Sequence, residues 1–210
     1  MRITKWITIS MIALTFSCLG ASRVLAGEGH GTKVRWDIFQ GEDITATSQT
    51  WAPGGISTSQ ATFYPAQFAG DNSTITLTGR GTFRLNDEHD VTGGGTWETA
   101  AADGTVTGSG TYRVTELVSF VFGPGSAAGY TAIIDEMGNL ADARAGVAVL
   151  KVHYSDGTNG IVVVVCSLGY PETPLDVIEG TTATKGYVDY SNPLIPTGLT
   201  SNTLFHILKE

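Results

Sequence analysis

Apolar and polar residues alternate with a period of two along most of the chain beyond residue 30, which is typical of β-strands with one buried face. No long segment has the 3.6-residue period of an amphipathic helix. The predicted strands are 33–39, 74–77, 111–122 (as one strand or two), 145–154, 161–168, 182–190 and 203–208. The segment 123–142 predicts a loop, or one helical turn near 133–137. A short helix is predicted to begin at Thr173-Pro174 and to end at Gly180.

A six-residue pattern, Thr-Gly-x-Gly-Thr-aromatic, occurs three times, at 78–83, 92–97 and 107–112. The copies begin 14 and 15 residues apart, which is too short for a helical repeat but fits consecutive strands joined by short turns. The pattern therefore predicts a β-meander. With the remaining strands it predicts an all-β fold, a single antiparallel β-barrel of about eight strands built around this meander.

In each repeat the glycines and the aromatic residue point to the same side of the strand, because side chains alternate between the two faces. Phe83, Trp97 and Tyr112 are predicted to point into the barrel, and the threonines to point to solvent. Glycine weakens a strand, and an aromatic ring on the neighbouring strand compensates by covering it. The repeat therefore predicts a curved wall in which aromatic rings lie across glycines.

The turn between the second and third repeats predicts their register. Asp103-Gly104 is a strong hairpin signal between two alternating segments. A turn centred there places Trp97 opposite Gly110 and Tyr112 opposite Gly95. Each of these two aromatic residues then covers a glycine.

The connection between the first and second repeats predicts a similar arrangement. A loop centred on His89 places Phe83 opposite Gly95 and Trp97 opposite Gly81. This register would again pair each aromatic ring with a glycine, and the glycines would permit the strong coiling that a small closed barrel needs.

The segment 74–83, Thr-Ile-Thr-Leu-Thr-Gly-Arg-Gly-Thr-Phe, resembles the Gly-Thr-Gly-x-Phe strand of dirigent proteins and allene oxide cyclases. These families form eight-stranded antiparallel barrels, often dimeric or trimeric, with an apolar cavity. The resemblance implies the same barrel and a small apolar ligand. It carries over no catalytic residue, because the polar cavity residues of those families have no clear counterparts here. Calycins share the barrel outline, but Val34-Arg35-Trp36 lacks the glycine of their Gly-x-Trp motif.

Two neighbouring predicted strands are apolar on both faces. They are 147–152 and 161–165, and the segment 155–160 between them has the composition of a hairpin turn. An antiparallel strand with one wet face should alternate, so something must cover the outer side of this hairpin, either the same chain or another subunit. We expect a homo-oligomer that assembles through the 145–168 hairpin.

The N-terminus has the pattern of a secretory signal peptide. Arg2 and Lys5 precede an apolar stretch at 6–19, and Val24-Leu25-Ala26 has small residues at the positions that precede a cleavage site. We predict that 1–26 is removed and that 27–210 is one barrel domain, secreted or periplasmic. No later segment has the length of apolar sequence that a membrane span needs.

The chain is acidic, with 12 basic and 20 acidic residues and a formal net charge of −8. Removal of the signal would make it more acidic, because 1–26 contains basic residues and no acidic ones. This charge excludes nucleic acid as a partner, since binding to phosphates needs Lys and Arg. Cys166 would be the sole remaining cysteine, which excludes an internal disulfide, and the four valines before it predict a buried thiol.

Six residues are candidates for binding a ligand: Phe83, Trp97, Tyr112, Glu116, His153 and His206. The three aromatic residues would line an interior cavity, or form a filled core if no cavity exists. The two histidines share strand faces with apolar residues, and Glu116 is a candidate inward carboxylate. A few polar groups in an apolar cavity are the usual design of a ligand site, and a purely structural role is the alternative for each histidine.

No cofactor, metal site or catalytic residue is predicted. Asp87-Glu88-His89-Asp90 gathers four possible metal ligands, but it lies in a connection where polar residues are expected and it lacks the spacing of an EF-hand. The chain has no zinc-ligand spacing and no Gly-x-Ser-x-Gly motif.

These observations favour a secreted small β-barrel that binds an apolar or aromatic small molecule in its interior. One alternative is a structural or interaction module with a filled core. Another is an isomerase or cyclase that acts on a bound hydrophobic substrate through His153, His206, Tyr112 or an inward carboxylate such as Glu116. The favoured barrel would itself be non-catalytic, or would act by holding a reactive ligand in one conformation.

Overall fold

A computed structural model of the protein describes residues 31–41, 49–61, 72–127, 130, 132–168, 179–194 and 203–209. The predicted signal peptide, its cleavage site and the predicted start of a helix at 173–174 lie outside these ranges. The described residues form strands joined by short turns, with one 3₁₀ turn, η1 (Leu140–Asp142), and no α-helix among them.

Fourteen strands are present in the described part of the chain. They are β1 (Lys33–Gly41), β2 (Gln49–Pro53), β3 (Ser57–Gln60), β4 (Thr74–Leu77), β5 (Arg80–Arg84), β6 (Asp87–Ala100), β7 (Val106–Ser126), β8 (Ile133–Asp135), β9 (Ala143–Tyr154), β10 (Asn159–Cys166), β11 (Gly180–Lys185), β12 (Val188–Tyr190), β13 (Asn192–Leu194) and β14 (Thr203–Leu208).

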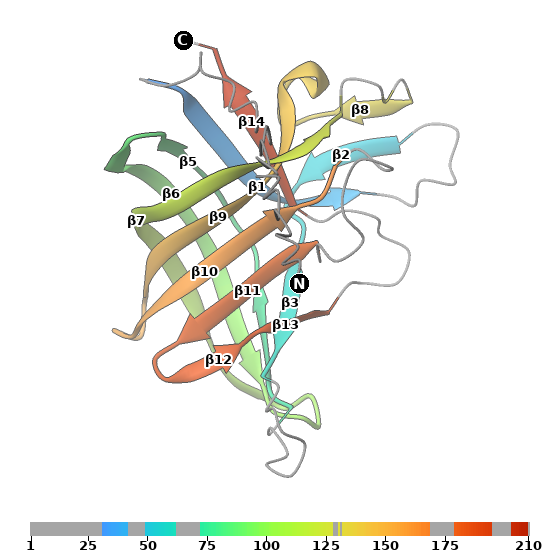
Figure 1. Ribbon diagram of the computed structural model, residues 1–210. Coiled ribbons are helices and arrows are strands. Elements are labelled where there is room, and N and C mark those ends of the chain that lie inside the picture. Colours follow the sequence, from blue (N-terminus) through green and yellow to red (C-terminus); the bar gives the residue numbers. More distant parts are fainter. Residues whose placement is uncertain are drawn as a thin grey trace, which may run out of the picture.

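Six of these strands close into an antiparallel barrel, in the order β1–β14–β9–β7–β6–β5 and back to β1 (Figure 1). The other strands extend the wall: β10, β11 and β12 continue from β9, while β4, β3 and β13 continue from β6. Among the described strands, β2 and β8 alone pair in parallel, and they lie beside the C-terminal end of β1. The predicted single antiparallel barrel is confirmed.

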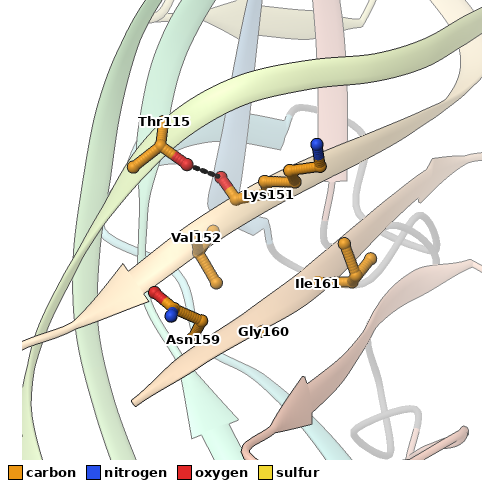
Figure 2. Close-up of a pocket in the computed structure, with 6 residues that line it drawn as sticks. All are labelled: Thr115, Lys151, Val152, Asn159, Gly160 and Ile161. Carbon is orange, nitrogen blue, oxygen red and sulfur yellow. Dashed lines mark hydrogen bonds between the residues drawn. The ribbon is translucent and has the colours of Figure 1, made fainter. Parts of the chain in front are cut away.

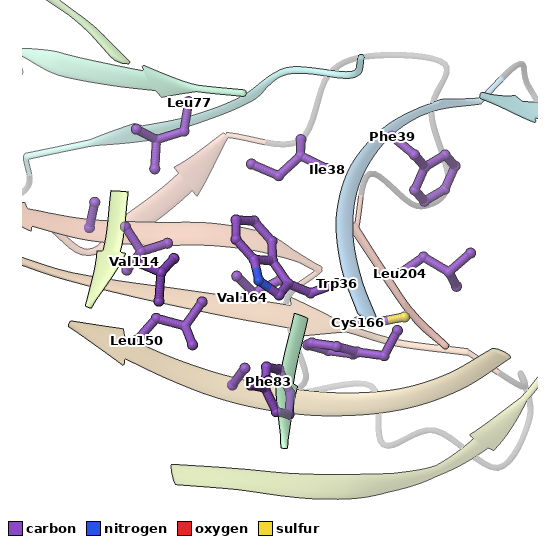
Figure 3. Packing of buried hydrophobic residues seen from close by; sticks show 14 of the residues in the cluster. Trp36, Ile38, Phe39, Leu77, Phe83, Val114, Leu150, Val164, Cys166 and Leu204 are labelled. Atoms are coloured by element: carbon purple, nitrogen blue, oxygen red, sulfur yellow. The ribbon is translucent and has the colours of Figure 1, made fainter. Parts of the chain in front are cut away.

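The period-two pattern explains why these segments form this wall. In β9, Ala148, Leu150 and Val152 are buried and alternate with more exposed residues. In β10, Val162 and Val164 do the same. The buried sides of the strands pack against one another inside the barrel (Figure 3), and burial of this apolar surface is the main stabilising contribution to the fold.

The register predicted for the second and third repeats is confirmed. Gly95 lies opposite Tyr112 and Trp97 lies opposite Gly110. A Cβ at Gly110 would approach within 3.0 Å of the Trp97 indole nitrogen, so the glycine leaves room for the ring to lie flat across the neighbouring strand.

The register predicted for the first and second repeats is wrong. The chain turns at 85–86 rather than around His89, and His89 lies in β6. Phe83 therefore pairs with Val91, and Gly81 pairs with Gly93. The turn is tight because Asn86 adopts a positive φ of 68°, a conformation that asparagine tolerates better than most residues.

The glycines of this pair serve close backbone approach. A Cβ at Gly81 would overlap the carbonyl oxygen of Thr92 and lie 2.8 Å from the Cα of Gly93. The ring that covers Gly81 is Trp36 of β1, whose indole nitrogen would lie 2.8 Å from the same Cβ. Trp97 instead pairs with Leu77 of β4 on this side.

Three other predictions differ from the structure. The segment 133–135 is a strand, β8, rather than a helical turn, because it pairs with β2. The predicted strand 182–190 is two strands, β11 and β12, joined by a turn at Gly186, whose φ is +61°. The strands also divide differently from the predicted barrel of about eight: six close the barrel and the others extend its wall, because wall strands bend and break, as at 78–79 between β4 and β5.

Candidate functional site

Side chains fill the centre of the barrel. Trp36 lies among Val114, Leu150 and Val164 (Figure 3), and no part of Trp36, Leu150 or Val164 is reached by solvent. A side chain without accessible surface has no water-sized space beside it, so the interior is packed around these residues. The two ends of the barrel differ from this centre and from each other.

One end is closed by an aromatic cluster with a cation over it. Trp97, Tyr112 and Tyr154 are buried there, with ring centres of Trp97 and Tyr154 5.9 Å apart. The Lys185 ammonium lies 4.2 Å from the centre of the Trp97 ring and pairs with Asp156. Its side chain is only 13% exposed, so the lysine covers the rings and this end is sealed.

The hydroxyl groups of this cluster are satisfied by backbone carbonyls. Tyr112 donates to the Thr78 oxygen at 2.9 Å, and Tyr154 donates to the Thr184 oxygen at 2.9 Å. Burial raises the pKa of both phenols well above their ordinary value. Both groups are therefore neutral donors that hold the wall together, and two of the six candidate residues, Trp97 and Tyr112, belong to this sealed end.

The other end of the barrel carries apolar side chains that point inward, all but one of them only partly buried. We call Phe83, Leu85, Val91, Phe120 and Phe122 the aromatic end. The ring centre of Phe120 lies 5.0 Å from that of Phe83 and 4.7 Å from that of Phe122. Phe83 has no exposed surface, whereas Phe120 and Phe122 remain partly exposed. The candidate residue Phe83 thus forms the inner limit of an apolar cluster that reaches the solvent.

Glu116 and His153 lie on the outer side of the wall rather than in the interior. Glu116 pairs with Lys151 at 2.6 Å, and the Nδ1 atom of His153 lies 2.8 Å from the Asn159 side-chain oxygen. A shallow depression of about 320 Å³ lies beside them (Figure 2). Its lining residues are Thr115, Lys151, Val152, Asn159, Gly160 and Ile161.

The outer side of β7, β9 and β10 beyond this depression is apolar. We call its residues the valine face: Val118, Val121, Val147, Val149, Ile161, Val163 and Val165. Val121 is 65% exposed and Val118 is 49% exposed, and the other five are partly exposed. This face is the outer side of the hairpin that the sequence singled out.

The outer side of β3 to β6 has the opposite chemistry. We call it the hydroxyl face, and three cross-strand pairs of threonine hydroxyls define it: Thr58–Thr76 at 2.9 Å, Thr78–Thr96 at 2.7 Å and Thr82–Thr92 at 2.8 Å. The prediction that these threonines point to solvent is confirmed for the exposed residues Thr92 and Thr96.

His206 is buried, but outside the barrel wall. Its neighbour Phe205 points inward against Phe83, and His206 points toward the segment around β8. Its Nε2 atom lies 2.6 Å from the Asp135 carboxylate, and the side chains are 1% and 2% exposed. A Cβ at Gly138 would lie 2.8 Å from the imidazole, so this glycine permits the loop to cover the ring.

This contact joins β8 to the barrel. Burial acts to raise the pKa of Asp135, but the hydrogen bonds from His206 and from the Met137 and Gly138 amides outweigh it, and the pKa lies below its ordinary value. The Nδ1 atom of His206 is buried without a hydrogen-bond partner among the described residues. The two buried side chains thus hold the β8 segment against β14.

The acidic run at 87–90 is used within its own hairpin. The Asp87 carboxylate accepts hydrogen bonds from the amides of His89 and Asp90, and Arg84 pairs with Asp90 at 2.8 Å. Among the residues that the structure describes, no group of three or more His, Cys, Asp or Glu side chains is arranged to hold a metal ion.

Sequence reasoning missed Phe120 and Phe122 as site residues. The segment 118–122 contains a signal that could have found them, because large apolar residues occupy both sides of this predicted strand. The register of β7 against β9 shifts between Val114 and Glu116 and again between Leu117 and Ser119. The first shift turns Glu116 outward, and the second restores the alternation, so Phe120 and Phe122 point to the same side as Tyr112.

Comparison with known protein families, with curated proteins and with solved structures finds no match to this chain. Over the described ranges, the structure contains no helix of the length and apolar character that a membrane crossing requires. The arguments about function therefore rest on the two ends and the two outer faces of the barrel.

Proposed function

We propose that the protein is a secreted β-barrel that binds an apolar or aromatic small molecule, and that the ligand enters at the aromatic end. The observation that carries the proposal is the partial exposure of Phe120 and Phe122 above the fully buried Phe83. An apolar ligand seated there would remove this aromatic surface from water and would stack against rings in tilted or edge geometry.

The packed centre of the barrel determines where the ligand lies. Because Trp36, Leu150 and Val164 have no accessible surface, a ligand contacts the aromatic end and reaches deeper only by displacing side chains. Secretion in this proposal rests on the signal pattern at 1–26, which lies outside the described residues.

Binding of a neutral apolar fluorophore, N-phenyl-1-naphthylamine, tests this proposal. We expect saturable binding that Phe122→Ser weakens by about tenfold or more, because loss of an aromatic contact surface costs roughly 1.5–3 kcal/mol. Val121→Ser is the matched control, since Val121 is the next residue but points to the outer side. No binding, or equal weakening by both variants, would refute the aromatic end as the site.

A second function is favoured by a different observation, the valine face. We propose that this face makes the barrel an interaction module, which joins through the outer side of the 145–168 hairpin in a homo-oligomer. Contiguous apolar surface of this kind marks contact sites on soluble proteins. The two proposals use opposite sides of the wall and are compatible.

The cyclase or isomerase hypothesis receives less support. Glu116 and His153 lie outside the wall, and His206 lies under the β8 segment. None of them contacts the aromatic end in the described residues, so a ligand bound there would meet apolar groups and no acid or base. Resemblance to the dirigent and allene oxide cyclase barrels supports the fold and the ligand class of the proposal only.

A further inference from the structure

We propose that Arg80 and Arg113, on the outer side of the barrel, together bind the phosphate or sulfate group of a small ligand. The site lies where the hydroxyl face meets β7, so it is separate from the aromatic end and from the valine face. It goes beyond both proposed functions, because neither of them uses this part of the wall.

The two arginines lie in one row of the wall with a glycine between them, which we call the arginine row. Gly94 of β6 pairs with Arg80 of β5 on one side and with Arg113 of β7 on the other. Neighbouring strands lie about 4.8 Å apart, so the Cα atoms of the two arginines are roughly 10 Å apart. Both side chains are exposed, and both are long enough to reach one ion above Gly94.

The backbone keeps the space between the arginines free of a side chain. Gly94 has a φ of +150°, a value that other residues rarely adopt. A Cβ at this position would also overlap the carbonyl oxygen of Tyr112. A glycine inside a strand commonly marks a place where a ligand or another backbone approaches closely. The arginine row therefore has an open floor.

The charge pattern of the chain makes these two arginines unusual. The chain has 12 basic and 20 acidic residues, so carboxylates are in excess. Most of the basic side chains that the structure describes pair with one, namely Arg35, Arg84, Lys151, Lys185 and Lys209. Within the described ranges, neither Arg80 nor Arg113 makes a hydrogen bond or an ion pair through its guanidinium group. Their donors are free for an anion from outside the chain.

The residues at the two ends of the row do not neutralise the arginines. Asp37 lies opposite Arg80 and attracts it, but Asp37 is buried and Arg35 lies 2.7 Å from each of its carboxylate oxygens. The residue opposite Arg113 on β9 is His153, which is not an acid. The row therefore keeps an excess of positive charge on an acidic protein.

Threonine hydroxyl groups flank the arginine row on both sides. Thr82 and Thr92 pair at 2.8 Å in the row on one side, and Thr78 and Thr96 pair at 2.7 Å in the row on the other. Each pair has two hydroxyl protons and uses one between its members, so one proton for each pair remains for an outside acceptor.

This arrangement of donors favours a tetrahedral oxyanion. Donors stand on four sides of Gly94, the arginines across the strands and the hydroxyl groups along them. A phosphate or sulfate group has oxygens for all four directions, whereas one arginine already satisfies both oxygens of a carboxylate. The net charge of −8 repels a polyanion beyond this patch, so we expect a small ligand with one such group.

Calorimetric titration with methyl phosphate at constant ionic strength tests the site. We expect saturable binding of one ion for each chain in the millimolar range, and affinities about tenfold weaker for Arg80→Gln and for Arg113→Gln. Arg113→Lys should recover only part of the loss, because lysine keeps the charge but lacks the planar fork. Lys33→Gln is the matched control, because it removes one charge from another described basic residue without an ion pair. It should leave the affinity unchanged.

Titrations with inorganic phosphate and inorganic sulfate identify the source of the oxyanion. Methyl phosphate that binds at least as tightly as the inorganic ions supports an ester as the ligand. Binding of the inorganic ions alone supports a free ion in the same two-arginine site.

Four results would overturn the inference. They are no saturable binding of any of the three ions, equal weakening by Lys33→Gln and the arginine variants, dependence on only one of the two arginines, and acetate binding as tight as that of methyl phosphate. Both arginines are exposed, so their substitution should leave the fold intact, and circular dichroism checks this for each variant. Binding of the neutral fluorophore at the aromatic end is unaffected by either arginine, so the two sites are tested independently.

Discussion

The outer wall of the barrel has two faces that occupy equivalent positions in the fold and have opposite chemistry. Both are outward sides of antiparallel strands over the same packed interior. The hydroxyl face pairs threonine with threonine across neighbouring strands, whereas the valine face places valine beside valine in the same geometry. Threonine and valine have nearly the same shape, so the difference between the faces is the hydroxyl group.

β7 shows where the change occurs, because its first half pairs with β6 beside the hydroxyl face and its second half belongs to the valine face. In its first half β7 presents Ser109 and Arg113 outward, and in its second half it presents Val118 and Val121. The two shifts of register against β9 lie between these halves, around Glu116. The outer side of β7 therefore changes from polar to apolar along one strand, in keeping with the proposal that its second half is covered in an oligomer.

The largest expected effect tests whether the two faces share one interior. Trp97→Ala, under the hydroxyl face, should lower the free energy of unfolding by about 3–5 kcal/mol, since it removes a buried ring and leaves a cavity over Gly110. Leu150→Ala, under the valine face, should cost about 2–5 kcal/mol. Urea denaturation measures both. A cost below 1 kcal/mol for either variant would mean that the region around it is not core.

A smaller effect is expected from the close backbone approach beneath the hydroxyl face. Gly81→Ala should cost about 1–3 kcal/mol, because the added methyl group overlaps the Thr92 carbonyl and pushes β5 from β6. Thermal unfolding measures the loss. Gly104→Ala is the control: it adds no contact within 4 Å and carries only the strain of a φ of +83°. A loss below about 0.5 kcal/mol for Gly81→Ala would contradict the crowding, because Gly81 has no positive φ and crowding is then the main expected source of its loss.

The pairs of threonine hydroxyls should contribute less than these glycines to the free energy of unfolding. A double-mutant cycle with Thr78→Val and Thr96→Val is expected to give a coupling of about 0.2–1 kcal/mol, since the pair is exposed and exchanges with water. The more informative measurement is solubility of the double variant, which should fall because the hydroxyl face would come to resemble the valine face. Unchanged solubility would contradict the view that the hydroxyl groups keep this face free of partners.

The smallest expected effect concerns the sealed end and depends on pH. The hydrogen bond from Lys185 lowers the pKa of Asp156 from 3.8 to about 2. A carboxyl whose pKa is lowered in the folded state contributes stability above its unfolded pKa, and that contribution is lost as pH falls from about 4 to about 2. Melting temperatures measured across this range should fall less steeply for Lys185→Met than for the unaltered chain. Parallel curves would show that the ion pair contributes nothing to acid stability.

The sequence allowed one register of the meander to be predicted and not the other, for a physical reason. Asp103-Gly104 strongly favours a hairpin turn, and a turn at this position fixes the register in which Trp97 lies opposite Gly110. The turn at 85–86 relies on Asn86 alone, and the acidic run after it suggested a loop. The run 87–90 instead forms the beginning of β6, where Arg84 pairs with Asp90 across the hairpin. This contact exists only once the two strands lie side by side.

The candidate site shows the same limit. Phe83 was predicted from its repeat, because alternation alone places it inward. The two single-residue shifts of register between Val114 and Ser119 cancel, so alternation counted from Tyr112 also places Phe120 and Phe122 inward. They were missed because they lie outside the repeat that drew attention to Phe83. For Glu116 and His153, the strands were predicted correctly but the side of the strand was not. Which side of a strand faces the interior depends on how the barrel closes, and the local pattern does not give it.

Cys166 gives the molecule a built-in reporter of its own opening. The thiol is buried, as predicted, and burial raises its pKa well above the ordinary value, so in the closed barrel it is both inaccessible and protonated. A thiol reagent would therefore modify it only during excursions that lift the end of β10 from the wall. Labelling kinetics at this one sulfur would time those excursions in the unaltered chain, without an added probe.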